Sequence, residues 1–150
     1  MRLAAVLLVM LLLGRPAAAM DPVWQSELLH AVNTARAAHG LAPLAWNGRL
    51  ARAAAAHAAD LQSCGRIAHE GCDGSDLARR LNRIGYGFRM AAENLAVCAC
   101  DADGVVRLWL GSDGHRRNLL NPNVTELGAD TRADPTDLRR ALWVLVLGRE

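Results

Sequence analysis

Apolar residues recur with helical spacing in the first half of the chain and predict three helices. The first begins near residue 24 and is stopped at Gly40, and its apolar stripe is Leu28, Leu29, Val32 and Ala35. A second helix is expected over residues 49–63 after an Asn47 cap, with His57 on the inner stripe, packed and hydrogen bonded. Ser75 is expected to cap a third helix over residues 76–84, on which three side chains face water: Arg79, Arg80 and Arg83.

The pattern changes to alternation in the second half. In the strand predicted for residues 88–97, Ala91, Glu93 and Leu95 share one face. Burying the carboxylate of Glu93 without a partner is costly, so we expect it to meet a cation, an imidazole, a metal or backbone donors. Two further strands are predicted, over residues 124–132 and over the continuous apolar run 141–147, which is typical of a strand covered on both faces.

Between these strands lies a short stretch rich in polar side chains. A helix carrying Trp109 is expected after Asp101, and turn-forming residues at 111–114 then interrupt it. We expect Asp113 to cap a new turn or helix that presents His115. The order of helices, strand, helix and two strands predicts an α+β fold, a three-layer α/β/α sandwich with a small antiparallel sheet.

Residues 1–19 have the pattern of a signal peptide. Arg2 precedes an apolar run over residues 3–13, and three alanines at 17–19 provide a cleavage site. The apolar run is short for a membrane span, which favours cleavage over the alternative of an uncleaved N-terminal anchor. We therefore expect a single domain over residues 20–150, secreted or periplasmic, with no stable membrane span once the leader is removed.

The charge balance argues against one class of partner. The chain holds 17 basic and 15 acidic residues. Two of the arginines, Arg2 and Arg15, lie in the predicted leader, so the remaining 15 basic residues equal the 15 acidic ones. A nucleic-acid-binding surface needs a clustered excess of positive charge, so we expect no nucleic-acid partner.

The chain has four cysteines, Cys64, Cys72, Cys98 and Cys100. An even number in an exported chain predicts disulfides, and more than one pairing is open. Cys64–Cys72 would close a local loop around His69, and Cys98–Cys100 would then form a tight ring that is easily reduced, while the crossed pairings stay open. A zinc cluster is the alternative, although its match to known ligand spacings is weak.

Several motifs together carry a family resemblance. The sequence around His115 is Gly-His-Arg-Arg-Asn-Leu-Leu-Asn-Pro, and the sequence around Glu93 is Ala-Glu-Asn-Leu-Ala. Shorter matches occur at residues 32–36, 40–44, 68–69 and 126–128. Over about residues 26–148 these motifs resemble a bacterial member of the CAP superfamily (SCP domain), whose relatives are cysteine-rich secretory proteins, antigen 5 and plant pathogenesis-related proteins.

The resemblance implies a three-layer fold with a cleft lined by two histidines and two glutamates. His69 matches the first histidine, Glu93 the first glutamate and His115 the second histidine. The second glutamate falls near Ser112, where this chain departs from the family pattern. The cleft residues that the resemblance implies are His69, Glu93, Ser112, His115 and Asn118.

The function that the resemblance implies is a secreted binding or interaction module for a lipid, another small ligand, a metal ion or a protein partner. One alternative is a hydrolase in which His69, Glu93 and His115 hold zinc or another divalent cation. A serine-type hydrolase would instead use Ser112 as nucleophile and His115 as base. No complete catalytic set is visible in the sequence, which favours the binding module.

A purely structural role is the remaining alternative. In it, Glu93 bridges His69 and His115 and locks the sheet to the loop. The carboxylate would raise the pKa of both rings. The side-chain amides of Asn94 and Asn118 would satisfy nearby backbone groups.

Overall fold

The computed structural model of this 150-residue chain describes residues 22–134, 137 and 139–150. The leader predicted over residues 1–19 lies outside the described residues and remains a prediction. The helices are α1 (Pro22–Ala37), α2 (Gly48–Cys64), α3 (Leu77–Arg83), α4 (Ala102–Leu110) and α5 (Asp113–Leu119). The strands are β1 (Ala45–Trp46), β2 (Met90–Cys98), β3 (Glu126–Ala133) and β4 (Ala141–Arg149). Among the described helices, none has the length and apolar character needed to cross a membrane.

The strands form one sheet in the order β1-β3-β4-β2. β4 pairs antiparallel with β2 on one side and with β3 on the other, which confirms the predicted antiparallel pairing for these strands. The sequence did not predict β1, which pairs parallel with β3 through Ala45 and Trp46. Two residues are too few to produce an alternating pattern, and the sheet is mixed rather than purely antiparallel.

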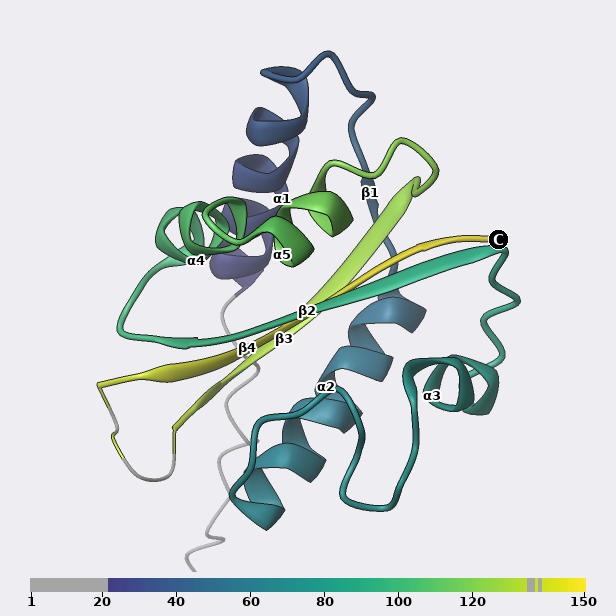
Figure 1. Cartoon of the computed structure of the whole chain (residues 1–150), viewed down its shortest axis with the longest axis vertical. Coiled ribbons are helices and arrows are strands. Elements are labelled where there is room, and N and C mark those ends of the chain that lie inside the picture. The colour runs from purple at the N-terminus through teal and green to yellow at the C-terminus, as the bar shows by residue number, and fades with distance from the viewer. Residues whose placement is uncertain (1–21, 135–136, 138) are drawn as a thin grey trace, which may run out of the picture.

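The sheet is covered by helices on both faces, as Figure 1 shows. α1, α4 and α5 lie on one face, and α2 and α3 lie on the other. Neighbouring residues of β4 accordingly point to opposite sides, with Leu145 in the cluster beneath α1 and α4 and Val144 in the cluster beneath α2. The predicted three-layer α/β/α sandwich is therefore confirmed.

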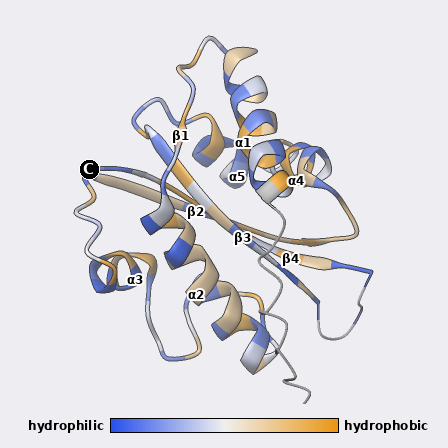
Figure 2. Ribbon diagram, turned by 180° about the vertical axis from the view of Figure 1, so that it is seen from behind, coloured by the Kyte–Doolittle hydropathy of each residue, from blue (hydrophilic) through white to orange (hydrophobic). Residues whose placement is uncertain are grey.

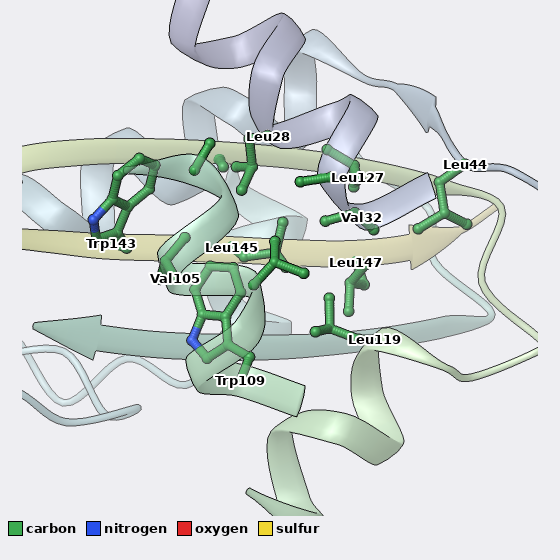
Figure 3. Packing of buried hydrophobic residues seen from close by; sticks show 14 of the residues in the cluster. Leu28, Val32, Leu44, Val105, Trp109, Leu119, Leu127, Trp143, Leu145 and Leu147 are labelled. Atoms are coloured by element: carbon green, nitrogen blue, oxygen red, sulfur yellow. The ribbon is translucent and has the colours of Figure 1, made fainter. Parts of the chain in front are cut away.

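The core beneath α1 and α4 is built around tryptophans, two of which are labelled in Figure 3. Trp143 packs edge to face against Trp24, with ring centroids 5.9 Å apart. Trp109 is fully buried, and its indole N–H donates to the carbonyl oxygen of Leu95 at 3.2 Å. Because β2 is an edge strand, this bond fastens α4 to the free edge of the sheet.

α2 lies directly on β3 because Gly128 carries no side chain at the contact. A Cβ atom at Gly128 would lie 2.1 Å from the backbone nitrogen of Ala51. Figure 2 shows hydrophilic and hydrophobic residues interspersed along α2, as expected for a helix with one buried face. His57 lies on that buried face, which confirms its predicted packing.

Two helix starts differ from the predictions by one residue. Asp76, rather than Ser75, caps α3, and its carboxylate accepts a hydrogen bond from the N–H of Arg79 at 2.8 Å. α5 already includes Asp113, and Ser112 occupies the N-cap position without a side-chain capping bond. Serine and aspartate are both favourable caps, so neighbouring pairs of them leave the exact start undecided in the sequence.

Both local disulfides are formed. Cys64–Cys72 ties the last turn of α2 to the loop that carries His69, and Cys98–Cys100 joins the end of β2 to the residue before Asp101. All four cysteines are paired, so the crossed pairings and the cysteine zinc cluster are wrong.

Candidate functional site

The site is centred on the carboxylate of Glu93, which is 3% exposed. Its Oε2 lies 2.8 Å from Nη2 of Arg80, and its Oε1 lies 2.9 Å from Nδ1 of His69. Nε2 of His57 lies 3.7 Å from Oε1. The sequence predicted that this buried acid needs a partner. It has two: the guanidinium of Arg80 on one oxygen and the imidazole of His69 on the other.

Arg80 does not face water, and that prediction was wrong. It is only 6% exposed, and its Nη1 donates to the carbonyl oxygens of Ser75 at 2.9 Å and His69 at 3.0 Å. The signal was present in the sequence, because Arg80 is three residues after Leu77 and four before Ile84, on the inward stripe of α3. That spacing alone did not outweigh the interpretation of three arginines as a solvated face, and the packing of α3 against β2 decides it.

His57 holds the loop in place from the opposite side. Its side chain is fully buried, and Nε2 lies 3.0 Å from the carbonyl oxygen of Ala68. Burial lowers the pKa of His57, and the raising effect of Glu93 is smaller, so the ring is neutral at pH 7. A neutral ring that donates from Nε2 to Ala68 fixes the residue immediately before His69.

His69 is the part of this cluster that solvent reaches, with a side chain 64% exposed. Its loop is braced by the Cys64–Cys72 disulfide and by the side chains of His57 and Arg80 on the carbonyls of residues 68 and 69. The hydrogen bond to Glu93 uses Nδ1, so in the neutral ring Nδ1 donates and Nε2 carries a free lone pair. The structure thus holds an oriented imidazole nitrogen at the protein surface.

α5 is joined to β2 in the same region through two side-chain amides, Asn118 of α5 and Asn94 of β2. The Asn118 Nδ2 donates to the Glu93 carbonyl oxygen at 3.2 Å and to Oδ1 of Asn94 at 2.9 Å. Asn94 in turn donates to the carbonyl oxygen of His115 at 3.1 Å. The predicted role of these amides in satisfying backbone groups is seen here, and it fixes the start of α5 against β2.

His115 is half-buried, and its Nδ1 is buried with no hydrogen-bond partner among the residues that the structure describes. Burial lowers the pKa of His115, and the charge of His69 lowers it further. Among the ion pairs of the described residues, Glu93 contacts His57, His69 and Arg80 but not His115. The expected bridge to His115 is therefore not made among the described residues, and the second imidazole near Oε1 is that of His57, 3.7 Å away without a hydrogen bond.

The expected rise in pKa from such a bridge is also wrong for His115. The ring gains no carboxylate contact, and removal from water disfavours its charged form. Ser112 is exposed, and its side chain makes no capping bond to α5 in the described part of the chain, so this helix start gives no support to a nucleophilic role.

The cleft beside this cluster has a volume of about 650 Å³. Its lining residues are His69, Glu70, Gly74, Asp76, Leu77 and Glu93. Of the predicted cleft residues, His69 and Glu93 line it. His115 and Asn118 approach from α5, and Ser112 lies exposed at the start of that helix.

The donor set has the chemistry of a zinc site but not its arrangement. In the described part of the chain, no three His, Cys, Asp or Glu side chains are grouped as metal ligands. Both oxygens of Glu93 are already engaged, which leaves the imidazoles of His69 and His115 as the available ligands. Two protein ligands are fewer than zinc sites use, so the metal assignment to His69, Glu93 and His115 remains a prediction.

Comparison with known proteins places this geometry in a family. A family model described as CAP, the cysteine-rich secretory protein family, matches residues 29–146. The uncharacterized membrane protein YlbC of Bacillus subtilis is 33% identical over 121 residues, covering 76% of this chain and 35% of the relative. The uncharacterized protein YkwD of the same organism is 29% identical over 105 residues, covering 70% of this chain and 41% of the relative. The chain thus spans less than half the length of either relative.

Solved structures agree with this match. An extracellular protein containing an SCP domain from Bacillus anthracis superposes with a TM-score of 0.71 at 31% identity, covering 83% of this chain and 40% of that protein. An outer surface protein from Borrelia burgdorferi has a TM-score of 0.78 at 21% identity, covering 87% of this chain and 96% of that protein, which shows the shared fold. The predicted resemblance is confirmed, and this chain belongs to the CAP family of cysteine-rich secretory proteins.

Proposed function

We propose that this chain is a secreted or periplasmic binding module that holds a small polar ligand in the cleft beside His69. One observation carries the proposal: the buried carboxylate of Glu93 fixes one nitrogen of an imidazole and leaves that ring exposed at the cleft. The description of the 31%-identical Bacillus anthracis relative as extracellular supports the location.

The cost of this arrangement supports a role in binding. Burying Glu93 and Arg80 removes both charges from water, and their attraction repays that cost only in part. What the pair provides is orientation, because a carboxylate bound to an imidazole fixes both the ring and its tautomer. Nε2 of His69 is therefore the atom that the ring presents to the ligand.

The lining of the cleft selects the chemistry of that ligand. Glu70 and Asp76 add carboxylates to the lining, and Leu77 supplies an apolar wall. These acids repel an anion and attract hydrogen-bond donors or a positive charge. A ligand bearing hydroxyl, amide or amine groups fits this lining best, with the half-buried ring of His115 approaching from α5.

The hydrolase alternative lacks a comparable observation. A serine nucleophile requires a base within hydrogen-bond reach. The hydroxyl of Ser112 makes no capping bond, and the Nδ1 of His115 has no partner to orient the ring as a base. We therefore assign binding rather than catalysis to the cleft.

Ligand-observed NMR with a panel of amine, amide and hydroxyl fragments tests the proposal. The proteins to compare are the wild type, His69→Ala and, as a matched control, His30→Ala, which removes an exposed histidine of α1. We expect fragments that bind the wild type to lose at least tenfold in affinity in His69→Ala and to be unaffected by His30→Ala. Fragment affinities that are the same in all three proteins would show that the cleft does not bind through His69.

A parallel titration with Zn²⁺ decides the metal assignment. Calorimetry of the wild type is compared with His69→Ala and His115→Ala. Heat that disappears in both variants would make a metal ion the ligand, in place of a fragment-like molecule. Equal heat in all three proteins would remove the metal assignment and leave the fragment result unchanged.

A further inference from the structure

The two disulfides enclose very different lengths of chain. Cys64 and Cys72 are 8 residues apart, whereas Cys98 and Cys100 are 2 apart, with Ala99 alone between them. A cross-link restricts the unfolded chain less as the loop that it closes becomes shorter. Cys98–Cys100 is therefore a poor structural staple, and its presence calls for another explanation.

Cys98–Cys100 lies where the sheet ends and α4 begins. Cys98 is the last residue of β2, opposite Ala141, and Cys100 precedes Asp101, the N-cap of α4. The two Cα atoms are 5.3 Å apart. A continuing strand would separate them by about 6.6 Å, so the bridge is made at the bend that stops β2. Figure 1 shows the chain turning from β2 towards α4 at this point.

The first turn of α4 is shaped to receive the side chain of Cys100. A Cβ atom at Gly104 would lie 2.7 Å from Cβ of Cys100 and 3.6 Å from its Sγ. Glycine inside a helix is about 1 kcal/mol less favourable than alanine. Gly104 therefore destabilises the helix slightly but leaves room for the side chain of Cys100. Helix N-termini also favour the thiolate form of a nearby cysteine, which makes that cysteine a better leaving group.

The surroundings of the two bridges also differ. Access to solvent does not set Cys98–Cys100 apart, because Cys64 and Cys72 are exposed while Cys98 and Cys100 are half-buried on either side of the exposed Ala99. The difference lies in how the chain around each bridge is held. The Cys64–Cys72 loop is held by other bonds: the N–H of Cys72 donates to Asp60 at 2.6 Å, and Arg66 donates to the Glu70 carbonyl oxygen at 3.0 Å. Those bonds hold the two ends of the Cys64–Cys72 loop in place beside the disulfide.

We propose that Cys98–Cys100 is a thiol–disulfide exchange site, while Cys64–Cys72 is the structural bridge. A thiolate of an external reductant attacks one sulfur of Cys98–Cys100, which forms a mixed disulfide and releases the other cysteine as a thiolate. A second thiol of the reductant then displaces the bound cysteine. After protonation the products are two cysteine thiols and the disulfide of the reductant, and the reverse sequence reoxidises the protein.

The test measures the reduction of each bridge separately in the wild-type protein. The protein is equilibrated in glutathione buffers of graded composition, quenched in acid and alkylated, and mass spectrometry of peptides quantifies each thiol. We expect half-reduction of Cys98–Cys100 at a value of [GSH]²/[GSSG] at least tenfold lower than for Cys64–Cys72. Equal values, or the opposite order, would overturn the proposal.

Two controls separate an exchange site from a weak staple. Cys64→Ser with Cys72→Ser is expected to leave the midpoint of the other bridge unchanged, because the two bridges react independently. Wild-type protein reduced only at Cys98 and Cys100 is expected to keep its far-UV circular dichroism and to return to the disulfide with oxidised glutathione. Unfolding on that selective reduction would show that the bridge is structural and that the proposal is wrong.

Discussion

Two of the described arginines, one on each side of the sheet, are buried, and the positive charge of each is compensated in a different way. Arg36 of α1 is 1% exposed and donates to three backbone carbonyl oxygens, those of Ala42, Leu119 and Asn121. Arg80 of α3 is 6% exposed and pairs with the carboxylate of Glu93. The charge of Arg36 is thus stabilised by carbonyl dipoles, and the charge of Arg80 by an opposite charge.

The different partners of the two arginines indicate different roles: Arg36 only connects parts of the fold, whereas Arg80 also supports the candidate site. Arg36 connects α1 to the segment before β1 and to the end of α5, where helix carbonyls carry partial negative charge. Its partners are main-chain atoms. Arg80 holds an acid whose other oxygen orients the exposed ring of His69, so the buried charge pair has a consequence at the surface. Removing either arginine is expected to destabilise the fold, but only Arg80 is expected to affect the cleft.

The largest effect is expected for Arg36→Met. The substitution leaves three buried or partly buried carbonyl oxygens without their donor, at about 1–3 kcal/mol for each fully buried group, so we expect a loss of about 4 kcal/mol in the free energy of unfolding. Urea denaturation measures it, with Arg52→Met on the exposed face of α2 as the control. A loss below about 1 kcal/mol would show that these carbonyls find water instead.

Arg80→Met is expected to cost slightly less, about 3 kcal/mol, because it leaves the buried carboxylate of Glu93 unpaired. The double variant Arg80→Met with Glu93→Leu is expected to regain most of that loss, since replacing a whole buried ion pair by apolar groups is often neutral. Urea denaturation of both single variants and the double variant gives the coupling free energy. Arg79→Met, one residue away and exposed, is the matched control and is expected to change stability by less than about 0.5 kcal/mol.

The cleft distinguishes Arg80→Met from Arg36→Met even where both proteins remain folded. In Arg80→Met the carboxylate loses its anchor, so the NMR signals of the His69 ring are expected to shift. In Arg36→Met they are expected to stay in place, because no bond of Arg36 reaches Glu93 or His69 among the described residues. Equal shifts of the His69 signals in the two variants would show that Arg80 supports the cleft no more than Arg36 does.

The layers of the fold were predictable because the spacing of apolar residues along a helix or strand indicates which of its faces is buried. The alternation around Glu93 placed that residue and Leu95 together on one side of β2, and the structure confirms it. β1 was missed because two residues carry no period, and its pairing depends on β3, about 80 residues later in the chain.

The sequence predicted some residues of the site but not which of them contact one another. The sequence identified Glu93 as an acid that needs a partner, and His69 as its neighbour through the family resemblance. It did not identify Arg80, because a helix with three arginines is usually a solvated face, and only the packing of α3 against β2 distinguishes one of them. His115 was misplaced as the second partner of Glu93, since spacing along the chain cannot distinguish it from His57.

A smaller effect is expected for Asn118→Ala, which breaks the amide chain between α5 and β2. The substitution removes the donor to the Glu93 carbonyl oxygen and to Asn94, so we expect a loss of about 1–2 kcal/mol. Asn94→Ala removes the same chain from the other end, so the double variant is expected to cost less than the sum of the singles. Thermal unfolding followed by circular dichroism provides the three values, and simple additivity would show that the two amides act independently.

The smallest effect is the response to acid, and it bears on the same comparison. Burial lowers the pKa of His57 and of His115 from the ordinary value of 6.5. Below pH 6.5 the unfolded chain therefore binds more protons at these rings than the folded chain does. Their contribution to stability is complete above pH 6.5 and is lost as the pH falls from there towards the lowered native values.

The acid response is expected to be local, because a guanidinium stays charged throughout this range and Arg36 is insensitive to it. Hydrogen exchange at pH 7.5 and pH 5 is expected to show lost protection around residues 68–80 and the start of α5, with the end of α1 unchanged. His57→Gln keeps a donor for the Ala68 carbonyl oxygen but cannot take up a proton, so the loss around residues 68–80 is expected to shrink in that variant. If His57→Gln lost protection there as fully as the wild type, the ring of His57 would not be the acid-sensitive part of the site, and His69 at the surface would be the next group to substitute.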